Sequence, residues 1–371
     1  MIKRISKPIF SKKTYLDIKN VLDSGNLVHG KFATIFEKKI SKYLNIKYCS
    51  LVSSGTAALH LSLQALKIGK GDEVILPAYS YIATANVIEI VGAKPIFVDI
   101  NIDDFCIDIE KIYEKITTKT KAIMPVHEFG MPSKINKICS IAKTNNLYVI
   151  EDAACALGAK YKDKHVGTFG KIGCFSLHPR KNITTGEGGI IVTNDKKIYN
   201  HVNSLKNHGI KFTNKNKVYA YPGYNYRITD IQATIGINQL RSLDSIISIR
   251  KKIALLYNKL LSEFKWIKIP NFDDTQVSVC QSYHIIISKD INLKDLSKFL
   301  KKNSIETGIG AQALPIQNYY SKKYKYKKLD YPNSYLAFKR GMVLPIGQHI
   351  NLKDVINIYK VFKKYNDIKY G

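Results

Sequence analysis

Lys181, a lysine between two apolar segments, is the most reactive candidate in the sequence. It lies in GCFSLHPRKNITTGEGG (residues 173–189), after the apolar run Gly173–Leu177 and before a glycine-rich turn. A lysine in a partly dry cleft loses its proton readily, and the neutral amine can form a Schiff base with a carbonyl compound. The alternative is a solvated loop lysine, because 52 of the 58 basic residues are lysines and only six are arginines. The GEGG turn alone indicates no more than a turn.

Small and hydroxyl residues open a second segment, SSGTAAL (residues 53–59). It follows the apolar run Cys49–Val52 and begins an amphipathic stretch, Ala57–Leu66. The free N–H groups of a helix start, together with a hydroxyl such as that of Thr56, bind an anion well, a phosphate especially. Taken alone, the segment is better explained as an ordinary N-cap, which needs only one of these residues.

Two adjacent acids, Glu151 and Asp152, end the strongly apolar run Leu147–Ile150 and precede small residues. Neighbouring side chains of a strand point to opposite faces, so only one of these acids can face a given cleft. A carboxylate at this place could hold a cationic ring nitrogen. An aspartate at a helix N-cap is the alternative.

An alternation of strands and helices is expected to bring the three segments together. Short apolar runs recur at Cys49–Val52, Glu73–Leu76, Pro95–Ile100, Ala122–Val126, Leu147–Ile150, Gly173–Leu177 and Gly189–Thr193. Amphipathic stretches lie between many of them, at Ala57–Leu66, Ser80–Val91, Ile107–Ile116 and Ser133–Thr144. The pattern predicts βαβ units and a mostly parallel sheet covered by helices on both faces. Ligands of such sheets bind outside the carboxyl ends of the strands.

The chain is long enough for two domains, with 371 residues. We expect a large domain over residues 1–245 and a smaller α+β domain over residues 246–371, with the break inside the helical stretch Asp230–Leu261. In the second domain we expect strands at Val279–Ser288 and Val343–Ile346, and helices at Leu293–Asn303 and Leu352–Tyr365.

A phosphate-binding helix start, a carboxylate and a lysine are together what an enzyme that uses pyridoxal 5'-phosphate needs. The sequence also resembles one family of such enzymes, the DegT/DnrJ/EryC1/StrS sugar aminotransferases. The resemblance covers nearly the whole chain and is carried by SSGTAALHLSL, GDEVILPAYSYIATANVI, GAKPIFVDI, PVHEFG, YVIEDAA, VGTFGKIGCFSLHPRKNITTGEGGIIVTND, NHG and GYNYRITDIQATIGINQL. It implies the α/β fold type I of aspartate aminotransferase, with a mostly parallel sheet flanked by helices and a smaller C-terminal α+β domain.

The resemblance implies the catalytic residues. Lys181 matches the lysine that binds the cofactor covalently and later moves a proton, and Asp152 matches the acid that pairs with the pyridinium nitrogen. Many members carry glutamine at the position of Cys155 and histidine at that of Leu157. A thiol cannot replace the amide hydrogen bond to the cofactor's ring hydroxyl, so the departure bears on how the ring is held and on substrate choice. His178 either faces the substrate or has a local structural role.

The resemblance also implies the residues that bind the cofactor. Gly55, Thr56 and Ser176 match ligands of its phosphate, and Tyr81 matches an aromatic residue stacked on its ring. Asn225, in GYNYR, matches an asparagine that reaches the phosphate of the neighbouring subunit's cofactor. The family consists of homodimers with active sites at the interface, so a homodimer with shared sites is implied here.

The implied activity is a transamination. The amino donor would be L-glutamate or a similar compound, and the acceptor a keto sugar linked to a nucleotide diphosphate, which becomes an amino sugar for surface polysaccharide synthesis. The lysine motif resembles that of 4-keto members more than that of 3-keto members. Dehydratase relatives carry histidine in place of the lysine, so Lys181 favours transamination. The alternatives are a smaller keto acceptor (an inosose or a keto-phosphate) and, remotely, a non-catalytic basic binding protein.

The charge and the cysteines bound the remaining choices. The formal net charge is +29, which by itself indicates nucleic acid, an acidic membrane surface or anionic small molecules. The excess is lysine rather than arginine, beside many Ile, Asn and Tyr residues, which favours codon composition as its cause, and we expect no nucleic-acid partner. The six cysteines show no C-x-x-C pair, so we expect neither a metal site nor disulfides. Without an apolar leader or a long apolar run, the expected location is the cytoplasm, with no membrane partner.

Overall fold

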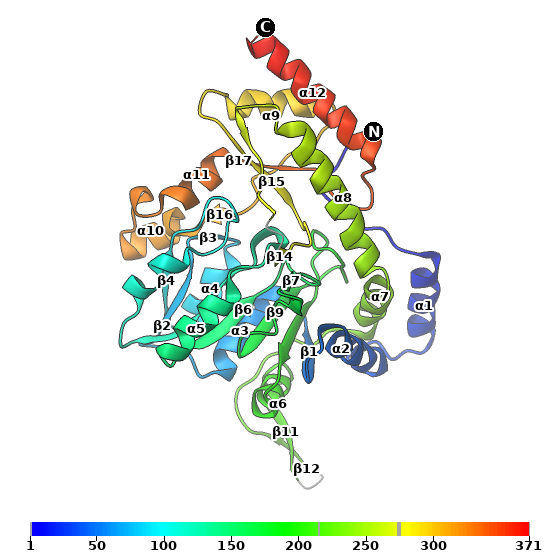
Figure 1. The fold of residues 1–371 in the computed structure, drawn as a ribbon. Helices are drawn as coiled ribbons and strands as arrows, with labels where there is room; N and C mark the ends of the chain where they lie inside the picture. Colours follow the sequence, from blue (N-terminus) through cyan, green and yellow to red (C-terminus); the bar gives the residue numbers. More distant parts are fainter. Residues whose placement is uncertain (1, 214–215, 273–275, 371) are drawn as a thin grey trace.

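A seven-stranded sheet forms the centre of the computed structural model, which describes residues 2–213, 216–272 and 276–370 (Figure 1). Its strand order is β1 (Tyr48–Val52), β10 (Gly189–Thr193), β9 (Ile172–Ser176), β6 (Tyr148–Asp152), β5 (Thr120–Ile123), β2 (Glu73–Pro77) and β4 (Lys94–Val98). Strand β10 runs antiparallel to both of its neighbours, and the other ladders are parallel. The prediction of a mostly parallel sheet is confirmed.

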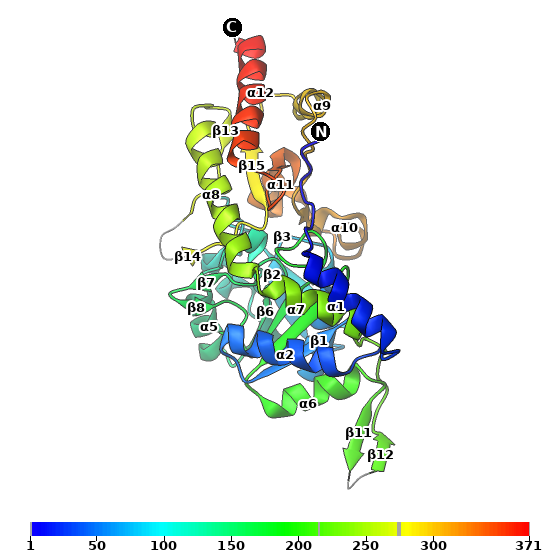
Figure 2. The same cartoon turned by 90° about the vertical axis from the view of Figure 1, so that its right-hand side faces the viewer.

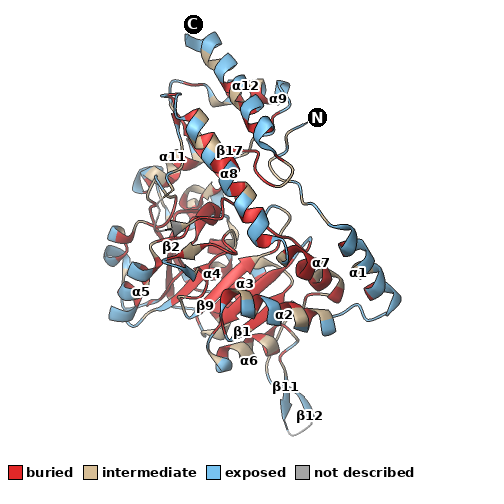
Figure 3. Ribbon diagram, turned by 45° about the vertical axis from the view of Figure 1, so that its right-hand side comes forward, coloured by how far each residue is buried: buried red, intermediate tan, exposed pale blue. Residues whose placement is uncertain are grey.

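Helices cover both faces of this sheet. One apolar cluster contains α2 (Lys31–Leu44), α5 (Ile135–Thr144) and α7 (Asp230–Leu240), and a second contains α3 (Gly55–Ala65), α4 (Ala83–Ile90) and α6 (Lys196–Leu205). Within β2, Ile75 packs into the first cluster, whereas Val74 and Leu76 pack into the second. Because every strand is buried on both sides, the strands appear as continuous apolar runs in the sequence. Figure 3 shows the buried sheet between partly exposed helices.

A third apolar cluster lies beyond the sheet and is built from residues 253–362. It joins β13 (Ile267–Lys268), β15 (Tyr283–Ile287) and β17 (Gly341–Leu344) with α9 (Leu293–Lys302) and α12 (Leu352–Tyr370). The long helix α8 (Leu243–Leu261) connects the regions, because its first turns pack into the sheet's cluster and its later turns into the third (Figure 2). The expected strands and helices of this region are present, with bounds shifted by a few residues. The proposed domain break at 245/246 falls inside α8 and stays a prediction.

The remaining elements are short or peripheral. They include α1 (Lys12–Asp23), which packs on α7, α10 (Asn318–Tyr324) and α11 (Pro332–Arg340). The short strands are the antiparallel pair β11 (Ile210–Thr213) and β12 (Asn216–Tyr219), β7 (Lys160–Tyr161) with β8 (Lys164–His165) and β14 (Gln276–Val277), and β3 (Tyr79–Ser80) with β16 (Gln312–Ala313). Single turns of 3₁₀-helix are η3 (Glu128–Gly130), η4 (Leu314–Ile316) and η5 (Lys328–Asp330). None of the helices among the described residues combines the length and apolar character needed to cross a membrane.

One helix prediction is wrong. Residues 107–116 form two separate turns of 3₁₀-helix, η1 (Ile109–Lys111) and η2 (Tyr113–Lys115), rather than one α-helix. The segment starts in extended form for two reasons. Ile107 forms an antiparallel β-bridge with Ile100, and the Asp108 N–H donates a hydrogen bond to the Asp99 carbonyl at 2.9 Å. Each turn then closes with a hydrogen bond between residues three apart, from the Ile112 N–H to the Ile109 carbonyl and from the Ile116 N–H to the Tyr113 carbonyl.

Two other predicted helices have different bounds. In the stretch 80–91, Ser80 belongs to strand β3, and α4 begins only at Ala83. The stretch 230–261 is two helices, α7 and α8, with the break at Arg241 and Ser242. The first difference depends on pairing with distant residues, in the β3–β16 ladder.

Candidate active site

A cavity of about 490 Å³ opens at the carboxyl ends of the parallel strands. Its volume lies within the usual range of small-molecule sites. All of the residues predicted for the site except Asn225 line it: Gly55, Thr56, Tyr81, Asp152, Cys155, Ser176, His178 and Lys181. The three reactive segments therefore meet at one edge of the sheet, as the parallel arrangement predicts.

The helix start at Gly55 forms one wall of the cavity. Ser54 is the N-cap of α3 and its hydroxyl accepts a hydrogen bond from the Ala57 N–H at 3.0 Å. The capping role considered for this segment is thus filled by Ser54. The first N–H groups of a helix have no partner within it, and the hydroxyls of Thr56 and Ser176 line the same cavity. A Cβ on Gly55 would lie only 2.8 Å from the Ser176 Cβ, so only glycine allows this approach.

Asp152 ends β6 and faces the cavity with 3% of its surface exposed. One carboxylate oxygen accepts a hydrogen bond from the Thr84 hydroxyl at 2.8 Å, and the other accepts one from the Ala154 N–H at 3.1 Å. Burial raises the pKa of Asp152, against the opposing effects of these two hydrogen bonds and of the nearby Lys181. The two hydrogen bonds fix the carboxylate plane.

The adjacent acid, Glu151, points to the other side of the sheet and is fully buried. Its carboxylate accepts hydrogen bonds from the N–H groups of Gly167, Phe169 and Gly170 at 2.6–2.7 Å. The His127 Nε2 lies 3.0 Å from the same carboxylate. The alternation of side chains along a strand predicts that the two acids face opposite sides of the sheet. Asp152 faces the cavity, and Glu151 binds the loop of residues 167–170.

Lys181 follows β9 in a tight turn, and its Nζ donates a hydrogen bond to the Cys155 Sγ at 2.9 Å. Burial alone would lower the pKa of Lys181, but Cys155, Glu128 and Asp152 together raise it. The pKa of Lys181 is therefore shifted opposite to the expectation of a lysine that readily loses its proton, because the carboxyl groups of Glu128 and Asp152 lie near its ammonium. Burial also raises the pKa of Cys155, against the attraction of the nearby Lys181 ammonium.

Glu128 is a site residue that the sequence did not single out. It lines the cavity, has 4% of its surface exposed, and has a pKa raised to about 7, chiefly by burial and against the attraction of Lys181. A signal was present, since Glu128 comes two residues after the apolar run Ala122–Val126, where a parallel strand is expected to end beside the other segments. Thr84 and Arg180 also line the cavity without having been predicted.

The other predicted residues occupy different places. Tyr81 lies at the cavity with 64% of its surface exposed. The His178 Nδ1 accepts a hydrogen bond from the Arg180 N–H at 3.2 Å, so the ring is bonded locally, and burial lowers the pKa of His178. Asn225 is exposed and pairs with Asn207 outside the cavity.

These residues fit pyridoxal 5'-phosphate. The helix start with its hydroxyls suits a phosphate, and the buried, hydrogen-bonded Asp152 suits a cationic ring nitrogen. Lys181, across the same cavity, suits the aldehyde. No group of three or more His, Cys, Asp or Glu residues in the described part of the chain could hold a metal ion, and the six cysteines are free. Leu157 packs in the apolar cluster rather than in the cavity.

Known proteins share both the sequence and the fold. Residues 8–363 match the model of the DegT/DnrJ/EryC1/StrS aminotransferase family. An uncharacterized protein of Methanocaldococcus jannaschii is 37% identical over 370 residues, which cover 96% of each chain. GDP-perosamine synthase of Escherichia coli O157:H7 is 47% identical over 230 residues, which cover 62% of this chain and 63% of that enzyme.

Solved structures agree with these matches. PseC of Helicobacter pylori, an aminotransferase involved in the biosynthesis of pseudoaminic acid, superposes with a TM-score of 0.93 at 26% identity, over 99% of this chain and 100% of PseC. A Streptococcus pneumoniae protein solved in a PLP-form and a PMP-form superposes with a TM-score of 0.93 at 27% identity, over 100% of this chain and 98–100% of that protein. The chain therefore belongs to the DegT/DnrJ/EryC1/StrS aminotransferase family, and it is a sugar aminotransferase that depends on pyridoxal 5'-phosphate.

Proposed function

We propose that this enzyme aminates a keto sugar linked to a nucleotide diphosphate, with a 4-keto group favoured, and that L-glutamate or a similar compound is the amino donor. The product would be an amino sugar for surface glycan synthesis in the cytoplasm. The names of the relatives support this class of substrate, since one is a GDP-perosamine synthase and another serves the biosynthesis of pseudoaminic acid.

The proposed roles follow from the geometry of the cavity. When bound, the cofactor supplies an electron sink for the carbon that loses its proton. Lys181 lines the cavity and acts as general base and acid: it would take the proton from the amino-bearing carbon of the donor in one half-reaction and deliver a proton to the former keto carbon of the acceptor in the other. Asp152, held by Thr84 and Ala154, stabilises a positive ring nitrogen. Cys155 holds the Lys181 amine in place.

The phosphate and the ring have their own proposed ligands. Gly55, Thr56 and Ser176 bind the phosphate at the start of α3, and Tyr81 covers the ring from the cavity mouth. Asn225 is exposed, outside its own cavity, and we propose that it contacts the phosphate in the neighbouring subunit of a homodimer. The described residues support this role by leaving Asn225 accessible to a second copy.

Substrate anions have a candidate partner in Arg180. It is exposed and lines the cavity beside Lys181 and His178. A guanidinium binds carboxylates and phosphates with two parallel hydrogen bonds, so Arg180 suits the carboxylate of the donor or the diphosphate of the acceptor. The net charge of +29 would raise the rate of encounter with both.

The observation that carries the proposal is the placement of Lys181 and Asp152 in one cavity. The test uses the holoenzyme with L-glutamate and a panel of nucleotide-linked 4-keto and 3-keto sugars, an inosose and a keto-phosphate, read by release of 2-oxoglutarate. Turnover with the nucleotide-linked 4-keto sugars at the highest kcat/KM is expected. Preference for the inosose or the keto-phosphate would overturn the proposed acceptor but not the aminotransferase activity.

A further inference from the structure

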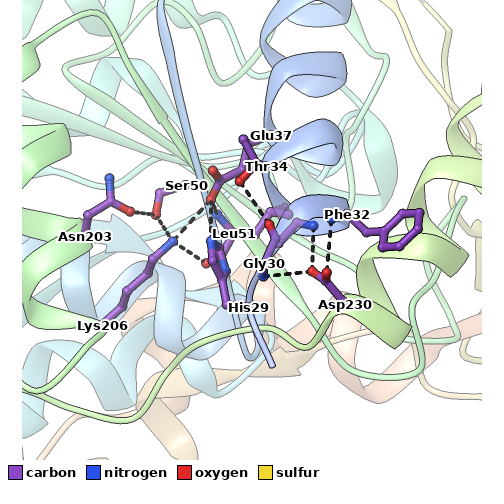
Figure 4. A network of polar contacts seen from close by, with 11 residues as sticks. His29, Gly30, Phe32, Thr34, Glu37, Ser50, Leu51, Asn203, Lys206 and Asp230 are labelled. Carbon is purple, nitrogen blue, oxygen red and sulfur yellow. Dashed lines mark hydrogen bonds and ion pairs between the residues drawn. The ribbon is translucent and has the colours of Figure 1, made fainter. Parts of the chain in front are cut away.

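Lys206 forms a buried ion pair with Glu37, away from the cavity. Only 5% of its side chain and 12% of that of Glu37 are exposed. The Lys206 Nζ donates to Glu37 at 3.2 Å, to the Ser50 hydroxyl at 2.8 Å and to the Leu51 carbonyl at 3.0 Å. All three ammonium protons therefore have acceptors. Figure 4 shows the side chain directed at these groups.

The ion pair holds the end of strand β1. Ser50 and Leu51 belong to β1, and Leu51 is held twice, because its carbonyl accepts from Lys206 and its N–H donates to Glu37 at 2.9 Å. The chain then runs through Ser53 to the helix start at Gly55. The position of the proposed phosphate ligands thus depends on where β1 ends.

The backbone of Lys206 holds a second segment of the proposed site. The Lys206 carbonyl accepts a hydrogen bond from the Tyr226 N–H at 3.0 Å, and the Tyr226 carbonyl accepts one from the Ser53 N–H at 2.9 Å. Asn225 lies within this segment and pairs with Asn207. One junction therefore sets the places of both the helix start and Asn225.

The helix that carries Glu37 is anchored by a further carboxylate. Asp230, the first residue of α7, accepts hydrogen bonds from the N–H groups of Gly30, Phe32 and Ala33 at 2.9–3.1 Å (Figure 4). These contacts anchor the start of α2, the helix that carries Glu37. The carboxylate that faces Lys206 is therefore held by the sheet and by α7.

Stability is a weak explanation for this arrangement. Removing two charges from water costs free energy that their attraction seldom exceeds, and apolar side chains of similar size often stabilise a core as well. Burial lowers the pKa of Lys206 while Glu37 opposes that change. A buried, fully bonded ammonium does, however, specify the relative position of the segments that it joins.

We propose that Lys206, held by Glu37, is a positioning residue for binding of the cofactor phosphate. It fixes the end of β1 relative to the Asn225 segment, so that the N–H groups at Gly55 and Thr56 point at the phosphate. This role rests on the proposed assignment of Gly55, Thr56 and Ser176 as phosphate ligands.

The test compares two ligands that differ only in the phosphate. Pyridoxamine 5'-phosphate and pyridoxamine lack the aldehyde, so neither forms a covalent bond with Lys181, and their Kd values for the full-length, cofactor-free protein report binding alone. The variants are Lys206→Met and the double variant Lys206→Met/Glu37→Gln. The double variant leaves no unpaired buried charge and guards against failure of the single variant to fold. Lys171→Met is the matched control, because its exposed ion pair with Asp195 is not part of the junction.

The expected result is a Kd for pyridoxamine 5'-phosphate that rises about tenfold or more in the double variant, equivalent to at least about 1.4 kcal/mol. The Kd for pyridoxamine should change by less than about twofold on the same scale, and the control should change neither. Equal weakening of both ligands, or no weakening of either, would overturn the proposal. If the unaltered protein itself binds the two ligands equally well, the phosphate ligands proposed for the site are wrong, which is a separate failure.

Discussion

The Lys181 amine and the Cys155 sulfur lie 2.9 Å apart, joined by a hydrogen bond inside the cavity. Many family members have glutamine at the position of Cys155, which would offer an amide to the cofactor ring. Here the residue contacts the lysine instead. Since Cys155 raises the pKa of Lys181, this contact bears on when the amine becomes neutral enough to react with an aldehyde.

Cys155→Ala should therefore shift cofactor capture to lower pH. The substitution removes a neighbour that raises the pKa of Lys181, so the neutral amine would be populated at a lower pH. The measurement is the rate at which cofactor-free protein takes up pyridoxal 5'-phosphate, followed by absorbance across pH 8–12, because the pKa of Lys181 lies above its ordinary value. Cys139→Ala, in the partly exposed helix α5, is the control. A midpoint that moves upward, or the same shift in the control, would contradict this account.

Substitution of Asp152 should lower activity, whereas substitution of Glu151 should lower stability. Asp152→Asn is expected to lower kcat about 10²–10³-fold, the usual effect of removing one electrostatic contact to a transition state, with little change in Tm. Glu151→Gln is expected to lower the free energy of unfolding by about 1–3 kcal/mol, because the buried donors around it lose a charged acceptor. Steady-state kinetics and thermal melts of both variants check the prediction. It fails if the two variants exchange these effects.

Glu128 should make the cofactor-free protein less stable as pH rises. Its pKa is about 7 in the fold against an ordinary 4.5, so the folded state binds the proton more tightly than the unfolded chain does. Its contribution to stability therefore falls between about pH 4.5 and 7, by up to about 3 kcal/mol at about 1.4 kcal/mol per pKa unit. Glu128→Gln should thus stabilise the protein more at pH 8 than at pH 5 in urea unfolding. The exposed Glu114→Gln serves as control, and an equal gain at both pH values would refute the effect.

Arg180→Gln should raise KM more than it lowers kcat. The guanidinium lies at the cavity but is assigned to a substrate anion rather than to the reacting atoms. Loss of a charge-assisted hydrogen bond costs about 1.5–3 kcal/mol, which corresponds to roughly a 10–100-fold rise in KM. Separate titrations of L-glutamate and of the nucleotide sugar show which anion it binds. Unchanged KM for both substrates would remove Arg180 from the site.

Parallel strands explain how much of the site could be predicted from sequence. The segments around Gly55, Asp152 and Lys181 each follow an apolar run, and a parallel sheet places such ends at one edge. The choice of Asp152 over Glu151 depends on the neighbouring loop 167–170, which supplies the N–H groups that bind Glu151. Strand alternation predicts that the two acids diverge but not which of them faces the cavity.

Residues that depend on long-range contacts escaped prediction. Lys206 looks like any other lysine in the sequence, and its role arises only when Glu37, Ser50 and Leu51 surround it. The raised pKa of Lys181 likewise depends on Glu128 and Cys155, which come from other segments. The helix expected at residues 107–116 fails for the same reason, since a bridge from Ile100 holds its start extended.

The most direct test of the central claim is turnover by Lys181→Ala. The holoenzyme and the variant, each reconstituted with pyridoxal 5'-phosphate, are given L-glutamate and a nucleotide-linked 4-keto sugar, and 2-oxoglutarate is measured over many turnovers. Lys164→Ala, an exposed lysine over the Phe169 ring, is the control. We predict normal turnover in the control and none in Lys181→Ala, although the variant should still bind the cofactor. Sustained transamination by Lys181→Ala would contradict the assignment of Lys181 and with it this account of the site.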